Sequence, residues 1–150
     1  MVTIRRILVP TDFSDCALPA VRYGAELAER FAAELILLHI VPDAVLALPD
    51  AVMPTPTPVA DLQALTESGK EGLANLVAAE KLEPRHPRTE VRIGSAAQEI
   101  IAAAGDLQAD LVCIGTHGRG GLARVLLGSV AELVVRQSPC PVLTVRPKEC

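Results

Sequence analysis

The chain has 150 residues, of which 50% are hydrophobic and 2% aromatic, and its formal net charge at pH 7 is −4. This length predicts one domain, residues 1–150, with a substantial aliphatic core. The negative charge and the lack of a Lys/Arg run argue against nucleic-acid binding. No apolar stretch approaches the roughly 18 residues of a membrane-spanning helix, and no signal peptide is recognisable, so we expect a cytoplasmic protein.

The first half of the chain has the pattern of two buried strands separated by a helix. The strands are predicted over Ile4–Pro10 and Ala33–Val41. The helix is predicted from Ser14 to about residue 33, and Pro19 implies that it starts late or has a distorted first turn. The proline-rich segment Pro42–Pro58 is incompatible with a regular helix or a central strand, so we predict a long surface loop there.

The second half continues the alternation of helices and strands. In chain order, beginning with a helix, the predicted elements are Ala60–Leu82, Thr89–Ile93, a helix from Ser95, Ala109–Gly115, Ser129–Gln137 and Cys140–Arg146. Ser95 and Gln98 have the spacing of a capping box at a helix start. Such an alternation predicts an α/β fold with an open parallel sheet of five strands and helices on both faces.

The stretch Gly115–Ser129, GTHGRGGLARVLLGS, combines several glycines with an apolar interlude. A bound phosphate needs several backbone N–H groups pointing at one spot, and glycine permits the close approach and positive φ that such loops use. Gly128 and Ser129 also stand where a helix is predicted to begin, and its free N–H groups and dipole favour an anion. We therefore predict phosphate binding, while the spacing of Ser129 and Glu132 predicts a capping box, a role that the same serine can combine with it.

Asp12 follows the first predicted strand, just as the glycine-rich stretch follows the fourth. In open parallel sheets, ligands bind beyond the carboxyl ends of strands where the strand order reverses. If these two strands are neighbours, both features face one crevice. Asp12 is then a ligand-binding residue, with Mg²⁺ or Mn²⁺ held at a bound phosphate as one option, or a turn residue beside Thr11 and Ser14.

Other nucleotide-binding and catalytic motifs are missing from the sequence. Gly69-Lys70 is followed by Glu71 in a helical pattern, which excludes a P-loop. The first strand is followed by Pro10-Thr11 without a glycine fingerprint, which argues against the usual dinucleotide-binding domain. There is also no G-x-S-x-G elbow of the kind that presents a nucleophilic serine.

Taken together, these residues resemble the universal stress protein family of the ATP-binding type. The family signature G-x2-G-x9-G-[ST] is matched by Gly115, Gly118, Gly128 and Ser129, and the stretches ILVPTDFS, LHIV and SPCPVLTVR are also similar to the family. The resemblance covers essentially the whole chain. It implies a Rossmann-like, adenine nucleotide alpha hydrolase-like sheet of strand order 3-2-1-4-5, and a homodimer.

The resemblance also implies which residues bind the nucleotide. Asp12 and Val41 match positions that contact the adenosine part, and the four signature residues match those that bind ribose and phosphates. With their neighbours, the expected ATP-binding residues are Pro10, Thr11, Asp12, Val41, Ile114, Gly115, His117, Gly118, Arg119, Gly128, Ser129 and Val130. The proline-rich loop matches no motif of the family.

Several side chains have two interpretations. His117 either touches phosphate or fills a turn, and Arg119 and Arg124 either clamp phosphate or are solvated. His39, on a buried strand, is expected to be a core histidine with satisfied hydrogen bonds rather than a ligand. The four cysteines lack metal-ligand spacing and are expected to be reduced, with Cys113 in the core.

These residues favour a nucleotide-dependent regulatory module of the stress response. Phosphoryl transfer needs a metal and a positioned nucleophile, and the sequence offers Asp12 no second acidic partner and no evident base, so slow hydrolysis is the most we expect. The alternatives are a true ATPase or phosphotransferase, and a flavin- or AMP-binding domain of the electron-transfer flavoprotein kind. The uncharged segment Val142–Val145 would be an edge strand in the implied order, and we expect it to form the homodimer.

Overall fold

The computed structural model describes residues 1–43, 59–117 and 127–148. Its strands pair in parallel in the order β3-β2-β1-β4-β5, which confirms the expected fold class and strand order. The strands are β1 (Arg6–Pro10), β2 (Glu34–Pro42), β3 (Arg88–Gly94), β4 (Leu111–Gly115) and β5 (Val142–Val145). Because β1 is central, its carboxyl end lies between the ends of β2 and β4.

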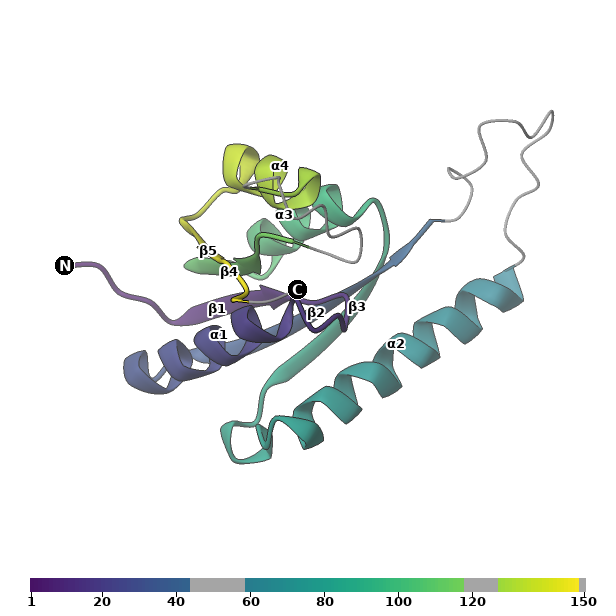
Figure 1. Ribbon diagram of the computed structural model, residues 1–150, viewed down its shortest axis with the longest axis horizontal. Coiled ribbons are helices and arrows are strands. Elements are labelled where there is room, and N and C mark those ends of the chain that lie inside the picture. Colours follow the sequence, from purple (N-terminus) through teal and green to yellow (C-terminus); the bar gives the residue numbers. More distant parts are fainter. Residues whose placement is uncertain (44–58, 118–126, 149–150) are drawn as a thin grey trace.

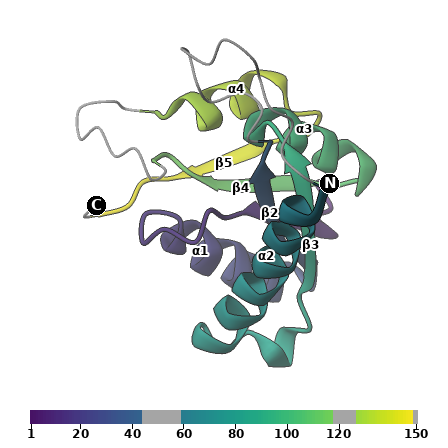
Figure 2. The ribbon, with the colours of Figure 1, turned by 90° about the vertical axis from the view of Figure 1, so that its right-hand side faces the viewer.

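Helices cover both faces of the sheet, as Figures 1 and 2 show. They are α1 (Leu18–Phe31), α2 (Val59–Ala79), α3 (Ala96–Asp106) and α4 (Ser129–Gln137), with a short 3₁₀ helix over Glu83–Arg85. Helices α1 and α2 lie on one face, and α3 and α4 on the other. In the described parts of the chain, no helix is both long enough and apolar enough to cross a membrane.

The core is divided by the sheet into two apolar clusters. In β1, Ile7 and Val9 pack with the residues of α1 and α2, whereas Leu8 packs with those of α3 and α4. This follows from the alternation of side chains along a strand. Because both faces are covered, the strands consist of nearly continuous apolar residues, which is why they could be recognised in the sequence.

Two helix starts differ from the capping-box expectation. Ser95 is the N-cap of α3, but its side chain makes no capping hydrogen bond. At α4 the N-cap is Gly128, so Ser129 is the first helical residue and its spacing to Glu132 is one position out of register for a capping box. Both capping-box predictions are therefore wrong, because sequence spacing alone sets neither the exact cap position nor the side-chain rotamer.

The structure also resolves the question raised by Pro19. Helix α1 begins at Leu18, so the proline lies in its first turn, where its missing N–H is not needed. The late start is the correct alternative. Strand β2 continues through Pro42, and the rest of the predicted proline-rich loop, residues 44–58, lies outside the described residues.

An ion pair joins α1 to the end of α2. Arg22 donates through Nε to one carboxylate oxygen of Glu80 at 2.8 Å and through Nη2 to the other at 3.0 Å. These hydrogen bonds lower the pKa of Glu80. The pair therefore stabilises the folded protein only while Glu80 is ionised.

We expect Glu80→Gln to decrease the free energy of unfolding slightly at neutral pH, because the Arg22 side chain is 60% exposed and water screens the pair. A carboxyl group with a lowered folded-state pKa stabilises fully above its unfolded pKa, about 4.3 for Glu, and loses this contribution as the pH falls through the folded-state value. Urea midpoints of wild type and variant should therefore converge below about pH 4. A difference that persists undiminished into acid would contradict the assignment.

Candidate functional site

The carboxyl ends of β1 and β4 separate where the strand order reverses. The pairing of β1 with β4 includes only Ile7 with Leu111 and Leu8 with Val112. By contrast, β1 pairs with β2 as far as Pro10, and β4 pairs with β5 as far as Gly115. The two central strands thus part before they end, which opens the sheet at the point where open α/β sheets bind ligands.

A threonine follows each of these strands. Thr11 and Thr116 are 7% and 5% exposed, and they are the buried polar residues of the described chain. The N–H of Thr11 donates to Leu38 O of β2 at 2.8 Å, while that of Thr116 donates to Val145 O of β5 at 3.0 Å. The two strand ends therefore bond outward, away from each other, and this arrangement maintains the opening between them.

After β1 the chain forms a tight turn around Asp12. One carboxylate oxygen of Asp12 accepts hydrogen bonds from the N–H of Ser14 at 2.9 Å and from its hydroxyl. The Thr11 hydroxyl oxygen accepts the N–H of Phe13 at 3.1 Å. The turn interpretation of Asp12 is thus part of its structure, and the turn places its carboxylate at the carboxyl edge of the sheet.

The two ends of the glycine signature meet at the end of β4. The N–H of Gly128 donates to Thr116 O at 2.7 Å, which places the start of α4 at the end of β4. A Cβ at Gly128 would lie 3.0 Å from that same oxygen, and a Cβ at Gly115 would lie 3.2 Å from Cys16 O. A side chain at either position would therefore be tight against a backbone oxygen, which favours glycine at both.

The prediction of positive φ does not hold at Gly128, whose φ is −68°. This extended conformation is open to any residue, so size is what selects glycine there. Helix α4 then begins with Ser129 and Val130, both exposed, and the first N–H groups of a helix have no partner within it. Together with the helix dipole they favour an anion at this end of the opening.

The remaining predicted residues occupy different depths. Pro10 ends β1 and is buried, and Ile114 is a core residue of β4. Val41 is 3% exposed and lies three positions beyond Leu38, the partner of Pro10, so it extends past the end of β1. Gly118, Arg119 and Arg124 lie outside the described residues.

The histidines have defined surroundings. His117 is half-buried, and its Nδ1 lies 2.8 Å from the Thr116 hydroxyl oxygen. His39 is half-buried, and its Nδ1 bonds Thr11 O at 2.9 Å, so the expectation of a satisfied histidine is confirmed. Within the described ranges, no three His, Cys, Asp or Glu side chains are grouped closely enough to hold a metal ion.

The cysteines depart in one respect from the expected reduced state. Cys16 is disulfide-bonded, whereas Cys113 and Cys140 are free thiols. Cys113 is fully buried and donates to Ala20 O at 3.4 Å, and burial raises its pKa to about 12. The expected core role of Cys113 is therefore confirmed, and at neutral pH its thiol is protonated and unreactive.

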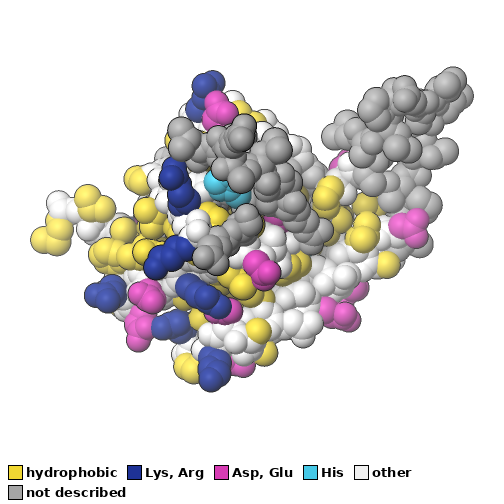
Figure 3. Space-filling model, in the orientation of Figure 1, with side chains coloured by type: hydrophobic (Ala, Val, Ile, Leu, Met, Phe, Trp, Pro, Cys, Tyr) yellow, Lys and Arg dark blue, Asp and Glu magenta, His cyan; other side chains and the backbone are white. Residues whose placement is uncertain are grey.

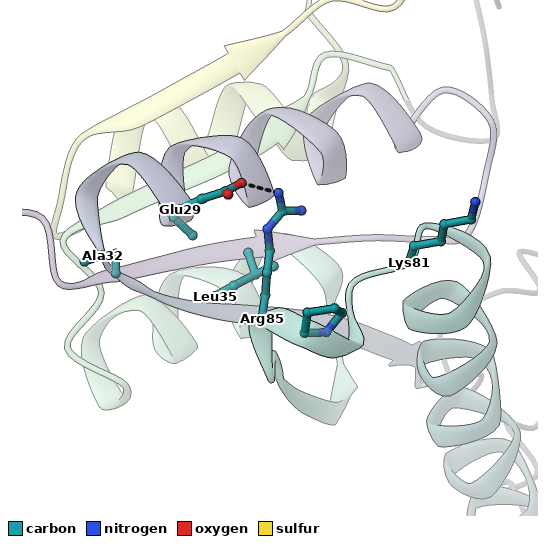
Figure 4. A pocket seen from close by; sticks show the side chains of 8 residues that line it. Glu29, Ala32, Leu35, Lys81 and Arg85 are labelled. Atoms are coloured by element: carbon teal, nitrogen blue, oxygen red, sulfur yellow. Dashed lines mark hydrogen bonds and ion pairs between the residues drawn. The ribbon is translucent and has the colours of Figure 1, made fainter.

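A pocket of about 450 Å³ lies at the opposite, amino end of the sheet. In Figure 4, Glu29 of α1 and Arg85 approach each other across it with an ion pair, in front of Leu35. Helix α1 ends here at its C-cap Ala32, and a helix C-terminus disfavours anions. Glu29 adds a negative charge and engages Arg85 in the ion pair, so this pocket is a poorer match for a phosphate-bearing ligand than the exposed start of α4.

Charge on the surface is mixed. Figure 3 shows both basic and acidic side chains on the face of the molecule that it presents. Among the described residues on this face the two signs of charge are interspersed, unlike the continuous positive surface that attracts a nucleic-acid backbone.

Two residues at the opening were missed by sequence reasoning. Thr116 was treated only as part of the spacing between signature glycines, although it contacts Val145 and Gly128 through its backbone. Phe13 carried no recognisable signal, yet it has a φ of 64° and stacks on His39. A buried threonine directly after each of two neighbouring strands is a pattern that could have identified the first.

Comparison with known proteins gives consistent matches over nearly the full chain. The model of the universal stress protein family matches residues 3–146. Universal stress protein MJ0531 of Methanocaldococcus jannaschii is 35% identical over 145 residues, covering 95% of this chain and 82% of that protein. Universal stress protein YxiE of Bacillus subtilis is 34% identical, covering 94% and 98%. A solved structure of hypothetical protein MJ0577 matches with a TM-score of 0.79 at 31% identity, covering 99% and 100%.

Proposed function

This chain belongs to the universal stress protein family, and we propose that it is an ATP-binding regulatory module whose nucleotide lies at the carboxyl ends of β1 and β4. The observation that carries the proposal is the hydrogen bond from Gly128 N to Thr116 O at 2.7 Å. It joins the two ends of the glycine signature at the opening between the strands. The phosphates would lie against the first N–H groups of α4, and the adenosine part between Asp12 and Val41.

The residues present fit such a ligand. At Gly128 even a Cβ would approach a backbone oxygen to 3.0 Å, so the backbone is closely packed where the signature closes. The exposed start of α4 supplies N–H donors for phosphate oxygens. Regulation by binding, with slow hydrolysis at most, is proposed from the sequence, which offers no evident base to activate a nucleophile.

Two more distant structures of the same fold have adenine nucleotides in their names. One is a universal stress protein in complex with cAMP, at 24% identity and a TM-score of 0.60. The other, from Archaeoglobus fulgidus, is in complex with dAMP, at 18% identity and a TM-score of 0.56. These ligands belong to those proteins, and the likeness to this chain concerns the fold. The choice of ATP rests on the complete signature in this sequence.

Mass spectrometry of the small molecules released from freshly purified protein tests this function. We expect ATP, or ADP and AMP derived from it, in a ratio approaching one per chain. Release of a flavin would instead support the electron-transfer flavoprotein alternative. ATP turnover well above background, abolished by Asp12→Ala, would replace the regulatory module by a true ATPase.

Asp12→Ala is expected to weaken ATP and AMP binding alike, by about ten-fold to a hundred-fold, because a charge-assisted hydrogen bond is lost. Calorimetric titration of both nucleotides, with and without Mg²⁺, measures this. Asp12→Asn is the matched control, because it keeps an oxygen that can accept the Ser14 N–H and so preserves the turn. A loss that requires Mg²⁺ and is larger for ATP would make Asp12 a metal-site residue, and no loss at all would leave it a turn residue.

We also propose a homodimer formed through β5. This strand lies at the edge of the sheet, and Thr144 in it is exposed. Tyr23 and Phe31 of α1, 57% and 50% exposed, lie on the flank of that helix turned away from the Arg22 contact with Glu80. Because α2 lies on the other side of α1, the flank with Tyr23 and Phe31 faces the β5 edge. These two exposed side chains would add apolar area to an interface formed by β5.

The predicted cytoplasmic location stays a prediction from the sequence.

A further inference from the structure

We propose that His39 and Phe13 act as positioning residues that hold the Thr11–Ser14 turn in its ligand-binding form and couple it to helix α2. The inference rests on the proposed function, because the turn carries Asp12. It goes further in assigning a role to two side chains outside the nucleotide signature and to a helix that contributes no predicted binding residue.

His39 is bonded directly to the turn. Its Nδ1–H donates to Thr11 O at 2.9 Å, across from β2 to the end of β1. The N–H of Thr11 donates to Leu38 O at 2.8 Å. Two consecutive residues of β2 therefore hold the N–H and the C=O of Thr11, which fixes the orientation of the peptide that leads into Asp12.

The Phe13 side chain, which follows Asp12 in the turn, packs against the His39 ring. Its ring stacks on the His39 ring with centroids 4.3 Å apart and an angle of 26° between the planes. The backbone of Phe13 has a φ of 64°, a left-handed conformation that a bulky side chain rarely adopts. Such a conformation persists only when the surrounding structure enforces it, and it is often found at ligand-binding sites.

Helix α2 provides that enforcement. A Cβ at Gly72 would lie 2.7 Å from Cζ of Phe13, and a Cβ at Gly69 would lie 3.1 Å from Cδ2 of His39. The helix backbone therefore packs directly on both rings. Gly69 and Gly72, which a P-loop does not explain, are the residues that make this approach possible.

These contacts form a continuous chain from α2 to the ligand site. Helix α2 packs on the rings of Phe13 and His39. These rings hold the Thr11 carbonyl and the Phe13 backbone, which stand on either side of Asp12 in the chain. A turn that is ordered before the ligand arrives lowers the entropic cost of binding. A shift of α2 would release the turn and weaken nucleotide affinity without touching the nucleotide.

The test separates the donor, the stack and the helix in the full-length protein. His39→Phe keeps an aromatic ring and removes the hydrogen bond, whereas His39→Asn keeps a donor at the δ position and removes the stack. Gly72→Ala disturbs Phe13 from α2. Gly105→Ala is the matched control, because a Cβ at this helical glycine meets nothing within 4 Å.

Two readouts are needed, namely ATP affinity by calorimetry and amide hydrogen exchange of Phe13 and Ser14. His39→Phe and Gly72→Ala are each expected to raise the Kd for ATP about three-fold to ten-fold. The first variant loses the hydrogen bond to Thr11 O, and the second displaces the Phe13 ring. Both should speed exchange at Phe13 and Ser14 while the strand amides stay protected. His39→Asn should restore part of the affinity lost in His39→Phe, and Gly105→Ala should match wild type.

Wild-type affinity and wild-type exchange in folded His39→Phe and Gly72→Ala would overturn the inference and leave the stack as core packing. The failure of the proposed function has a different signature, because wild type itself would then bind no ATP. In that case the exchange rates alone decide: faster exchange of the turn supports positioning, and unchanged exchange overturns it. If His39→Phe fails to fold, Gly72→Ala and His39→Asn carry the same comparison.

Discussion

Gly128→Val is expected to abolish ATP binding while leaving the protein folded. A Cβ at this position would lie 3.0 Å from Thr116 O, the same oxygen that accepts the Gly128 N–H at 2.7 Å. Because that oxygen belongs to the backbone, the neighbour cannot rotate away. The larger valine side chain is expected to shift the start of α4 relative to the end of β4, which would move its N–H groups away from the proposed phosphate position.

The comparison with Gly128→Ala identifies the cause. The φ of −68° at Gly128 suits either residue, so backbone strain is excluded and only the Cβ contact and side-chain size remain. Alanine should therefore lose part of the affinity, and valine all of it. Calorimetry measures affinity, and thermal unfolding followed by circular dichroism verifies the fold. Undiminished ATP affinity in folded Gly128→Val would show that the nucleotide does not bind here.

Thr144→Pro is expected to convert the proposed dimer into a monomer. The N–H groups of Val112 and Thr116 donate to Pro141 O and Val145 O, so alternate residues of β5 face β4. Thr144 has the opposite orientation to Pro141 and Val145, so its N–H and C=O point away from β4, to the open edge of the sheet. Proline removes that outward N–H and leaves the pairing of β5 with β4 in place.

Size-exclusion chromatography with light scattering measures the mass of the complex. Wild type should have twice the chain mass of 15.8 kDa, and Thr144→Pro should approach the single-chain value. Leu143→Lys should do the same by placing a charge on β5, where Leu143 is half-buried, whereas Thr144→Val should remain dimeric. ATP binding should survive in all of them, because the opening lies on the β1 side of β4. A wild-type monomer across micromolar concentrations would contradict the interface.

The sequence by itself determined the fold class of this protein. Strand and helix patterns depend on side chains a few positions apart, and strands buried on both faces are nearly continuous apolar runs, as in β2. Helix α4 was predicted with its observed bounds, Ser129–Gln137, although the capping role predicted for Ser129 was wrong, and the resemblance based on the glycine signature indicated the strand order. Strand and helix patterns can be recognised in the sequence because all the residues that form one pattern lie within a single short segment of the chain.

Only the tertiary structure decided why particular residues stand at the opening. Glycine at position 128 is favoured by the close approach of Thr116 O, twelve positions earlier, and not by a positive φ. Phe13 adopts its left-handed φ under α2, against Gly72, a residue far away in the chain. These requirements arise from backbones and rings that meet only when the sheet and helices are assembled, and no local pattern of side chains encodes them.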